Sequence, residues 1–141
     1  MNKLLLLGKI FLISSFWCVY LLFISTIFDV YRADLKAVNS KEVLGAGDSA
    51  EAYILAQEAV ALNPYRPYYY KNRAQVLLIS FMAADAVPPE EIKEQIFNDL
   101  QKSLVLNPEN LASLRNNIPL YYYLALENLS VENSEENMEV F

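Results

Sequence analysis

The sequence predicts an all-α protein in which a transmembrane helix precedes a small domain of stacked antiparallel helical hairpins. Two observations support this fold class. Residues 10–28 form a run of nineteen residues without a charge, between Lys9 and Asp29. Farther along the chain, a Leu-Asn-Pro stop recurs at residues 62–64 and 106–108, each time after a segment with helical periodicity.

The uncharged run has the length of a bilayer. At about 1.5 Å of rise per residue, a helix over residues 10–28 spans roughly 28 Å, close to the ~30 Å of the hydrocarbon layer. A cleavable signal peptide has a shorter apolar core and a small-x-small cleavage site, which residues 25–31 lack. We therefore expect residues 1–9 to form a short basic tail and residues 10–28 to be a retained transmembrane helix in contact with lipid.

Basic residues flank the run on both sides and bear on its orientation. Lys3 and Lys9 precede it, and three basic residues follow it, partly offset by Asp29 and Asp34. A short basic N-terminal segment rarely crosses the membrane. The expectation is a single-pass protein with a cytoplasmic N-terminus and an extracytoplasmic helical domain.

Composition excludes several function classes. Two of the eleven basic residues and none of the seventeen acidic residues precede Asp29, so the rest of the chain carries a net charge of −8. Such a surface repels phosphate backbones, and we expect no nucleic-acid partner. The chain has no histidine and one cysteine, Cys18, which rules out a zinc site of Cys and His. We find no motif for catalysis or phosphate binding, and so expect no enzyme activity, catalytic residue, metal or cofactor.

Local stop signals divide residues 29–129 into helices. The first helix continues from the span toward Leu44 and is broken by Gly45-Ala46-Gly47, and Asp48 or Ser49 caps a second helix that ends at Leu62. Three more are expected, from Pro67 to near Ala83, from Pro88-Pro89 to Leu106, and from near Asn110 to Leu129. Pro119 should kink or restart the last helix. Residues 130–141 are acidic without periodicity, which indicates a disordered tail.

Small and apolar residues recur at fixed distances from the two prolines. They are Ala52, Ala56 and Ala59 before Pro64, Tyr70, Ala74 and Leu77 after it, and Leu114, Ile118 and Tyr121 after Pro108. This pattern resembles the tetratricopeptide repeat (TPR), a pair of antiparallel helices of about 34 residues. The two stops are 44 residues apart, so the resemblance implies a longer loop near residues 84–91. It implies about two and a half units and a scaffold for protein–protein interaction.

A second resemblance leads to an alternative function. The segments ALNPYRPYYYKNRA (residues 61–74) and LVLNPENLASLRNNIPLYYYLA (residues 104–125) follow an apolar span. This arrangement is similar to the C-terminal tails of some bacterial O-antigen ligase/polymerase-type membrane proteins. The resemblance implies a C-terminal or split accessory part in cell-surface glycan assembly. The catalytic residues of that family lie in segments that have no counterpart here.

The candidate binding residues are tyrosines and arginines. Tyrosine offers a large contact area at a small entropy cost, and arginine clamps carboxylates, so we select the residues that could share one groove. They are Tyr69, Tyr70, Arg73, Arg115 and Tyr122. The alternative is that the tyrosines pack between helices and that the arginines form surface ion pairs.

The expected partner is a protein or peptide, most simply a component of the membrane or of the bacterial cell envelope. A partner helix or extended segment would lie against the concave face of the hairpin stack. A stack of about two and a half repeat units leaves one of its ends uncovered. We therefore also expect that the chain could associate with a second copy of itself.

Overall fold

The computed structural model describes residues 2–109, 115, 117–123 and 125. Four helices, α1 to α4, follow one another in the chain; they are α1 (Asn2–Gly45), α2 (Ser49–Leu62), α3 (Pro67–Ala83) and α4 (Glu90–Leu106). Residues 117–123, which include Pro119, are also helical. No strand occurs among the described residues, so the all-α class is confirmed. The expected tail, residues 130–141, lies outside the described residues.

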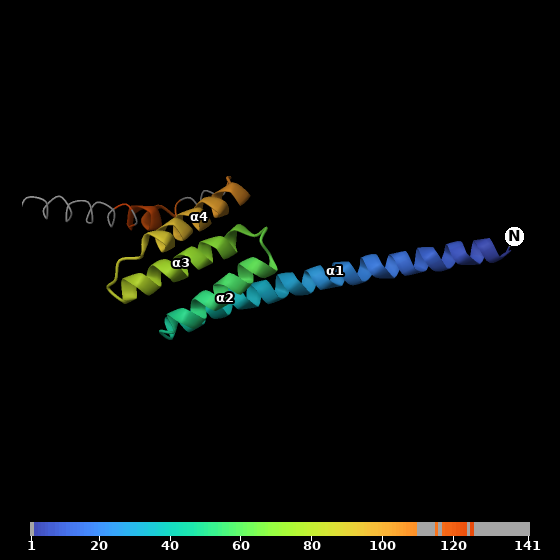
Figure 1. Cartoon of the computed structure of the whole chain (residues 1–141), viewed down its shortest axis with the longest axis horizontal. Coiled ribbons are helices and arrows are strands. Elements are labelled where there is room, and N and C mark those ends of the chain that lie inside the picture. Colours follow the sequence, from blue (N-terminus) through green and yellow to red (C-terminus); the bar gives the residue numbers. More distant parts are fainter. Residues whose placement is uncertain (1, 110–114, 116, 124, 126–141) are drawn as a thin grey trace, which may run out of the picture.

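Helix α1 is much longer than the others. It begins at Asn2, so it includes residues 2–9, the short basic segment that precedes the uncharged run. Its N-terminal half projects away from the other helices, and its C-terminal part lies along α2 (Figure 1). The helical segment Phe11–Gly45 contains a stretch that is long and apolar enough to cross a membrane, by length and composition, and none of that stretch is buried against the protein.

The turn between α1 and α2 is built from local hydrogen bonds. The amides of Gly47 and Asp48 donate to the carbonyls of Leu44 and Val43, at 3.0 and 3.2 Å. Gly47 has φ +94°, a left-handed conformation that a side chain would strain. The Asp48 carboxylate then accepts the Glu51 amide at 3.0 Å and so caps α2, as the sequence predicted.

Small side chains set the distance between α1 and α2. Ala33 and Ala37 of α1 and Ala59 of α2 are completely buried in one cluster with Tyr69 of α3. A second cluster joins Ala52 and Ala56 of α2 to Val76 of α3. Because alanine has only a methyl group, the helix backbones approach closely and leave little room for a larger side chain.

A third cluster joins α3 to α4. Its buried members are Ala74, Leu77, Leu78, Ile96 and Leu100, and Leu120, Tyr121 and Tyr123 pack against it. Consecutive helices therefore pack against one another, and α1 also contacts α3. The α2–α3 connection lies at the end of the bundle that faces the projecting half of α1, and the α3–α4 connection lies at the opposite end (Figure 1).

A substitution of Ala37 by leucine tests the close packing of α1 and α2. Ala37 is completely buried, so the larger side chain should overpack the interface and lower the free energy of unfolding by about 1–3 kcal/mol. Val38, the next residue, is 49% exposed, and Val38→Leu should have little effect. Urea denaturation of the full chain in detergent micelles, followed by circular dichroism, measures both. Equal stability of the two variants would contradict this packing.

Candidate functional site

A groove of about 420 Å³ lies between the C-terminal part of α1 and α3. Its described lining residues are Lys41, Leu44, Gly45, Asn72, Gln75, Val76 and Ile79. Aliphatic side chains make up much of this surface, with a few polar groups among them. A concave apolar surface with a few placed polar groups is typical of a binding site.

Asn72 is the buried polar residue among those that line this groove. Its side chain is 1% exposed. The Asn72 amide nitrogen donates to Ser40 Oγ at 2.7 Å, and Ser40 Oγ donates to the Ala37 carbonyl at 2.9 Å. Asn72 Oδ1 has no hydrogen-bond partner among the described residues. A buried acceptor without a partner is costly, and because this oxygen is itself closed off from solvent, a ligand N–H group could reach it only if the surrounding side chains moved aside.

The sequence carried a signal for Asn72 that the site prediction did not use. Tyr69, Asn72 and Val76 are spaced by three and four residues, which places them on one face of a helix. Tyr69 and Val76 are core residues. An asparagine in register with two core residues is a buried polar group, and such a group needs either an internal partner or a ligand.

One lysine, Lys41, is among the residues that line the groove, and its charge also acts on Lys71 of α3. Lys41 Nζ lies 4.9 Å from the centre of the Tyr68 ring. Lys71 is half-buried, and this burial, together with the charge of Lys41, lowers the pKa of the Lys71 ammonium group. None of the described lining residues is acidic. In a chain of net charge −6, this is a local site of the opposite sign, which favours a partner with carboxylates.

Tyr69 connects α3 to α1 through a hydrogen bond. It is completely buried, and its hydroxyl donates to Asp34 Oδ1 at 2.7 Å. Arg66 Nη1 donates to both oxygens of the same carboxylate, at 2.7 and 2.8 Å. Burial, with the hydrogen bond to Asp34, raises the pKa of Tyr69 to about 12. Tyr69 therefore helps to hold in place the two helices that form the groove.

Tyr70 and Arg73 make intramolecular contacts. The Tyr70 hydroxyl donates to the Pro64 carbonyl at 3.1 Å. Arg73 Nε and Nη2 donate to the two oxygens of Asp99 on α4, at 2.8 and 2.6 Å, and both side chains are largely buried. These hydrogen bonds raise the pKa of Arg73. A partner carboxylate would have to displace Asp99 from Arg73.

Arg115 and Tyr122 are the two predicted site residues that follow α4 in the chain. Both side chains are exposed, Tyr122 by 64%. Neither they nor Tyr69, Tyr70 and Arg73 are among the residues that line the α1–α3 groove. The five selected residues thus do not meet in this groove, and their role in partner binding stays a prediction.

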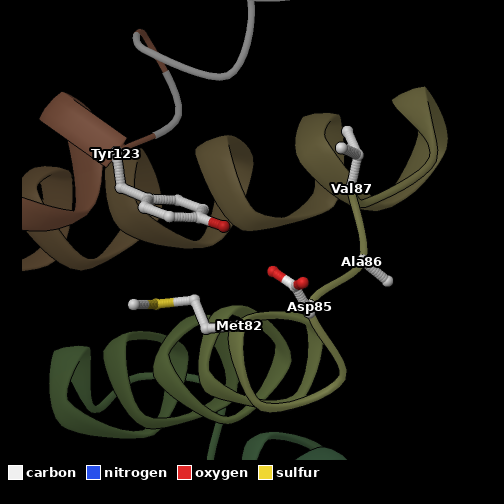
Figure 2. A pocket seen from close by; sticks show the side chains of 5 residues that line it. All are labelled: Met82, Asp85, Ala86, Val87 and Tyr123. Atoms are coloured by element: carbon white, nitrogen blue, oxygen red, sulfur yellow. The ribbon is translucent and has the colours of Figure 1, made fainter.

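A second pocket, of about 340 Å³, lies beside the α3–α4 connection. Its described lining residues are Met82, Asp85, Ala86, Val87 and Tyr123. Figure 2 shows the Asp85 carboxylate and the Tyr123 hydroxyl directed into the space between α3 and the helical residues around Tyr123. No group of three His, Cys, Asp or Glu side chains that could hold a metal ion occurs among the described residues.

Replacing Asp99 by asparagine tests the internal pairing of Arg73. Asp99 is 3% exposed, and its neutralisation leaves the guanidinium without a counter-charge, so stability should fall by about 3 kcal/mol. Glu58→Gln is the matched control, because Glu58 pairs with Lys36 at 2.6 Å on the surface, where such a loss costs about 0–1 kcal/mol. Denaturation in micelles measures both variants. A small, equal cost for the two would show that Arg73 does not depend on Asp99.

The raised pKa of Tyr69 predicts a loss of stability in alkali. The unfolded chain releases the phenol proton near its ordinary pKa of 10, whereas the folded chain keeps it to about pH 12. The contribution of this group is therefore full below pH 10 and is lost as the pH rises toward 12. The free energy of unfolding should fall more steeply across this window in the wild type than in Tyr69→Phe.

The exposed Val38 supplies the control for this titration. Val38→Leu should keep the wild-type pH profile, because the Val38 side chain is exposed and carries no titrating group. Identical profiles for the wild type and Tyr69→Phe would be incompatible with a buried, hydrogen-bonded Tyr69 phenol.

Comparison with known proteins gives no family assignment. No protein-family model matches the chain, and a search of curated proteins finds no match. The resemblances to TPR proteins and to O-antigen ligase-type membrane proteins therefore stay predictions.

Proposed function

We propose that the chain is a membrane-anchored helical scaffold that binds a protein or peptide segment in the α1–α3 groove. The observation that carries the proposal is Asn72 Oδ1, a buried acceptor without a described partner on a residue that lines an apolar groove. A backbone or side-chain N–H of a bound segment would supply its hydrogen bond. The function requires no chemistry beyond binding.

The proposal includes a TPR-like arrangement of the helices. In it, the C-terminal part of α1 pairs with α2, α3 pairs with α4, and residues 117–123 belong to the first helix of a further unit. The packing of consecutive helices and the additional contact of α1 with α3 support this arrangement. The first helices of successive units would then line the concave face, where the groove lies.

The anchor is residues 10–28. Its support is the apolar stretch of α1, in which none of the described side chains is buried against the protein. The proposed topology has a cytoplasmic N-terminus and an extracytoplasmic groove. Restriction to the membrane raises the effective concentration of the scaffold toward other envelope components, so a modest affinity suffices for binding.

The charges and the apolar surface define the chemistry of the partner segment. Lys41 at the rim favours a carboxylate, and Leu44 and Ile79 offer contact to an apolar side chain. A segment that carries an apolar residue next to an acidic residue would contact the aliphatic side chains and Lys41 at the same time. Asn72 would lie between these two contacts. A groove formed by two helices can bind such a segment in either an extended or a helical conformation.

Site-specific photocrosslinking in native membranes tests this function. Benzoylphenylalanine placed at Ile79 should form an adduct with one defined protein or peptide, because Ile79 lines the groove and is 45% exposed. Lys41→Glu in the same chain should reduce that adduct at least about tenfold by reversing the charge at the rim. Immunoblotting and mass spectrometry read out the adduct.

The control places the same crosslinker at Ile54. This residue is 55% exposed on α2 and does not line the groove. It should give no adduct that depends on Lys41. An adduct at Ile79 that survives Lys41→Glu unchanged, or an equal adduct at Ile54, would argue against binding in the groove.

A further inference from the structure

The α2–α3 turn lies at a defined height above the apolar run. Asp34 is six residues beyond Phe28, the last residue of that run, which is about 9 Å along a helix. Arg66, the residue before α3, is hydrogen-bonded to the Asp34 carboxylate at 2.7 Å. The turn that contains Arg66 is therefore held beside α1 at this height, and Figure 1 shows it at the end of the bundle that faces the projecting half.

This height falls close to the headgroup layer of a bilayer. The polar layer of each leaflet is about 5–8 Å thick, given about 40–45 Å for the whole bilayer and ~30 Å for its hydrocarbon. A side chain that points from the turn toward the membrane by a few ångströms would enter that layer. The inference rests on the proposed anchor, because it takes Phe28 as the boundary of the hydrocarbon.

Tyr65 is the side chain that the turn offers. It is 83% exposed, the highest value among the exposed large hydrophobic side chains of the described residues. The Tyr65 amide donates to Asn63 Oδ1 at 3.2 Å, which fixes the backbone of the turn. On α1, Tyr31 is 63% exposed three residues beyond Phe28. Tyrosine is enriched at membrane interfaces because its ring is apolar and its hydroxyl remains hydrated.

The charges around the turn are compatible with lipid headgroups. Six charged side chains at this end of the bundle form three ion pairs; these are Asp29 with Arg32 at 4.0 Å, Asp34 with Arg66 at 2.7 Å, and Lys36 with Glu58 at 2.6 Å. Each pair is neutral, although the chain as a whole carries −6. This end of the domain therefore does not repel a bilayer as the acidic remainder would, and it does not require anionic lipid.

We propose that the α2–α3 turn is a second membrane contact, in which Tyr65 inserts into the headgroup layer of the bilayer that α1 crosses. A single helix fixes the position of the domain but leaves it free to tilt. A second contact at Tyr65 limits the tilt and so sets the direction in which the α1–α3 groove opens.

Tryptophan fluorescence in phosphatidylcholine vesicles tests the insertion. The natural Trp17 is the single tryptophan of the chain and lies in the apolar run. In a Trp17→Phe background, Tyr65→Trp places the probe at the turn, and Val87→Trp places it at the α3–α4 connection, at the opposite end of the bundle. Val87 is 52% exposed, so both replacements are at solvent-accessible positions.

Quenching by lipids with a spin label on the headgroup gives the expected result. The quenching constant should be at least about twofold larger for Tyr65→Trp than for Val87→Trp, and the Tyr65→Trp emission should shift to shorter wavelength in vesicles. Circular dichroism checks that both variants keep the helix content of the parent. Equal quenching at the two positions would overturn the proposal.

The wild-type chain separates this outcome from failure of the anchor. Trp17 should be quenched by lipids that are brominated on the acyl chains if α1 crosses the bilayer. If Trp17 is quenched and the probes at positions 65 and 87 are quenched equally weakly, the transmembrane anchor is supported. The same result contradicts the second contact at Tyr65. Absence of Trp17 quenching removes the anchor and, with it, the proposed insertion of Tyr65.

Discussion

The Asp34 carboxylate connects the long helix α1 to the rest of the bundle. It accepts hydrogen bonds from the Tyr69 hydroxyl at 2.7 Å and from Arg66 Nη1 at 2.7 and 2.8 Å. One carboxylate thereby fixes the start of α3, the α2–α3 turn and the C-terminal part of α1 relative to one another. Together with the hydrogen bond between Asn72 and Ser40, this contact holds α1 and α3 at the spacing that forms the groove.

The local signals in the sequence located the ends of the helices well, for a physical reason. Asn63-Pro64 and Asn107-Pro108 follow α2 and α4 directly, and Pro67 begins α3. A proline or a left-handed glycine acts on the hydrogen bonds of its own turn, so its effect is visible without knowledge of the tertiary structure.

The site was harder to predict because its contacts join residues distant in sequence. Asn72 bonds Ser40, thirty-two residues earlier, and Arg73 bonds Asp99, twenty-six residues later. Residue type indicated that Arg73 binds a carboxylate, but it could not distinguish a carboxylate of the same chain from one of a partner. The spacing of Asn72 with Tyr69 and Val76 indicates that Asn72 is buried. Whether its side-chain oxygen finds a hydrogen-bond partner depends on the position of α1, which the sequence does not show.

The two polar groups that α3 buries differ in what they leave for a ligand. Arg73 and Asp99 satisfy each other through two short hydrogen bonds, so this pair orients α3 against α4 and has little left to offer a partner. Asn72 donates to Ser40 with its amide nitrogen, and its oxygen is buried and has no hydrogen-bond partner among the described residues. A leucine in its place would avoid that cost in a purely structural helix pair. The bundle alone leaves this acceptor without a partner, and in the proposed function a bound segment supplies the missing N–H group.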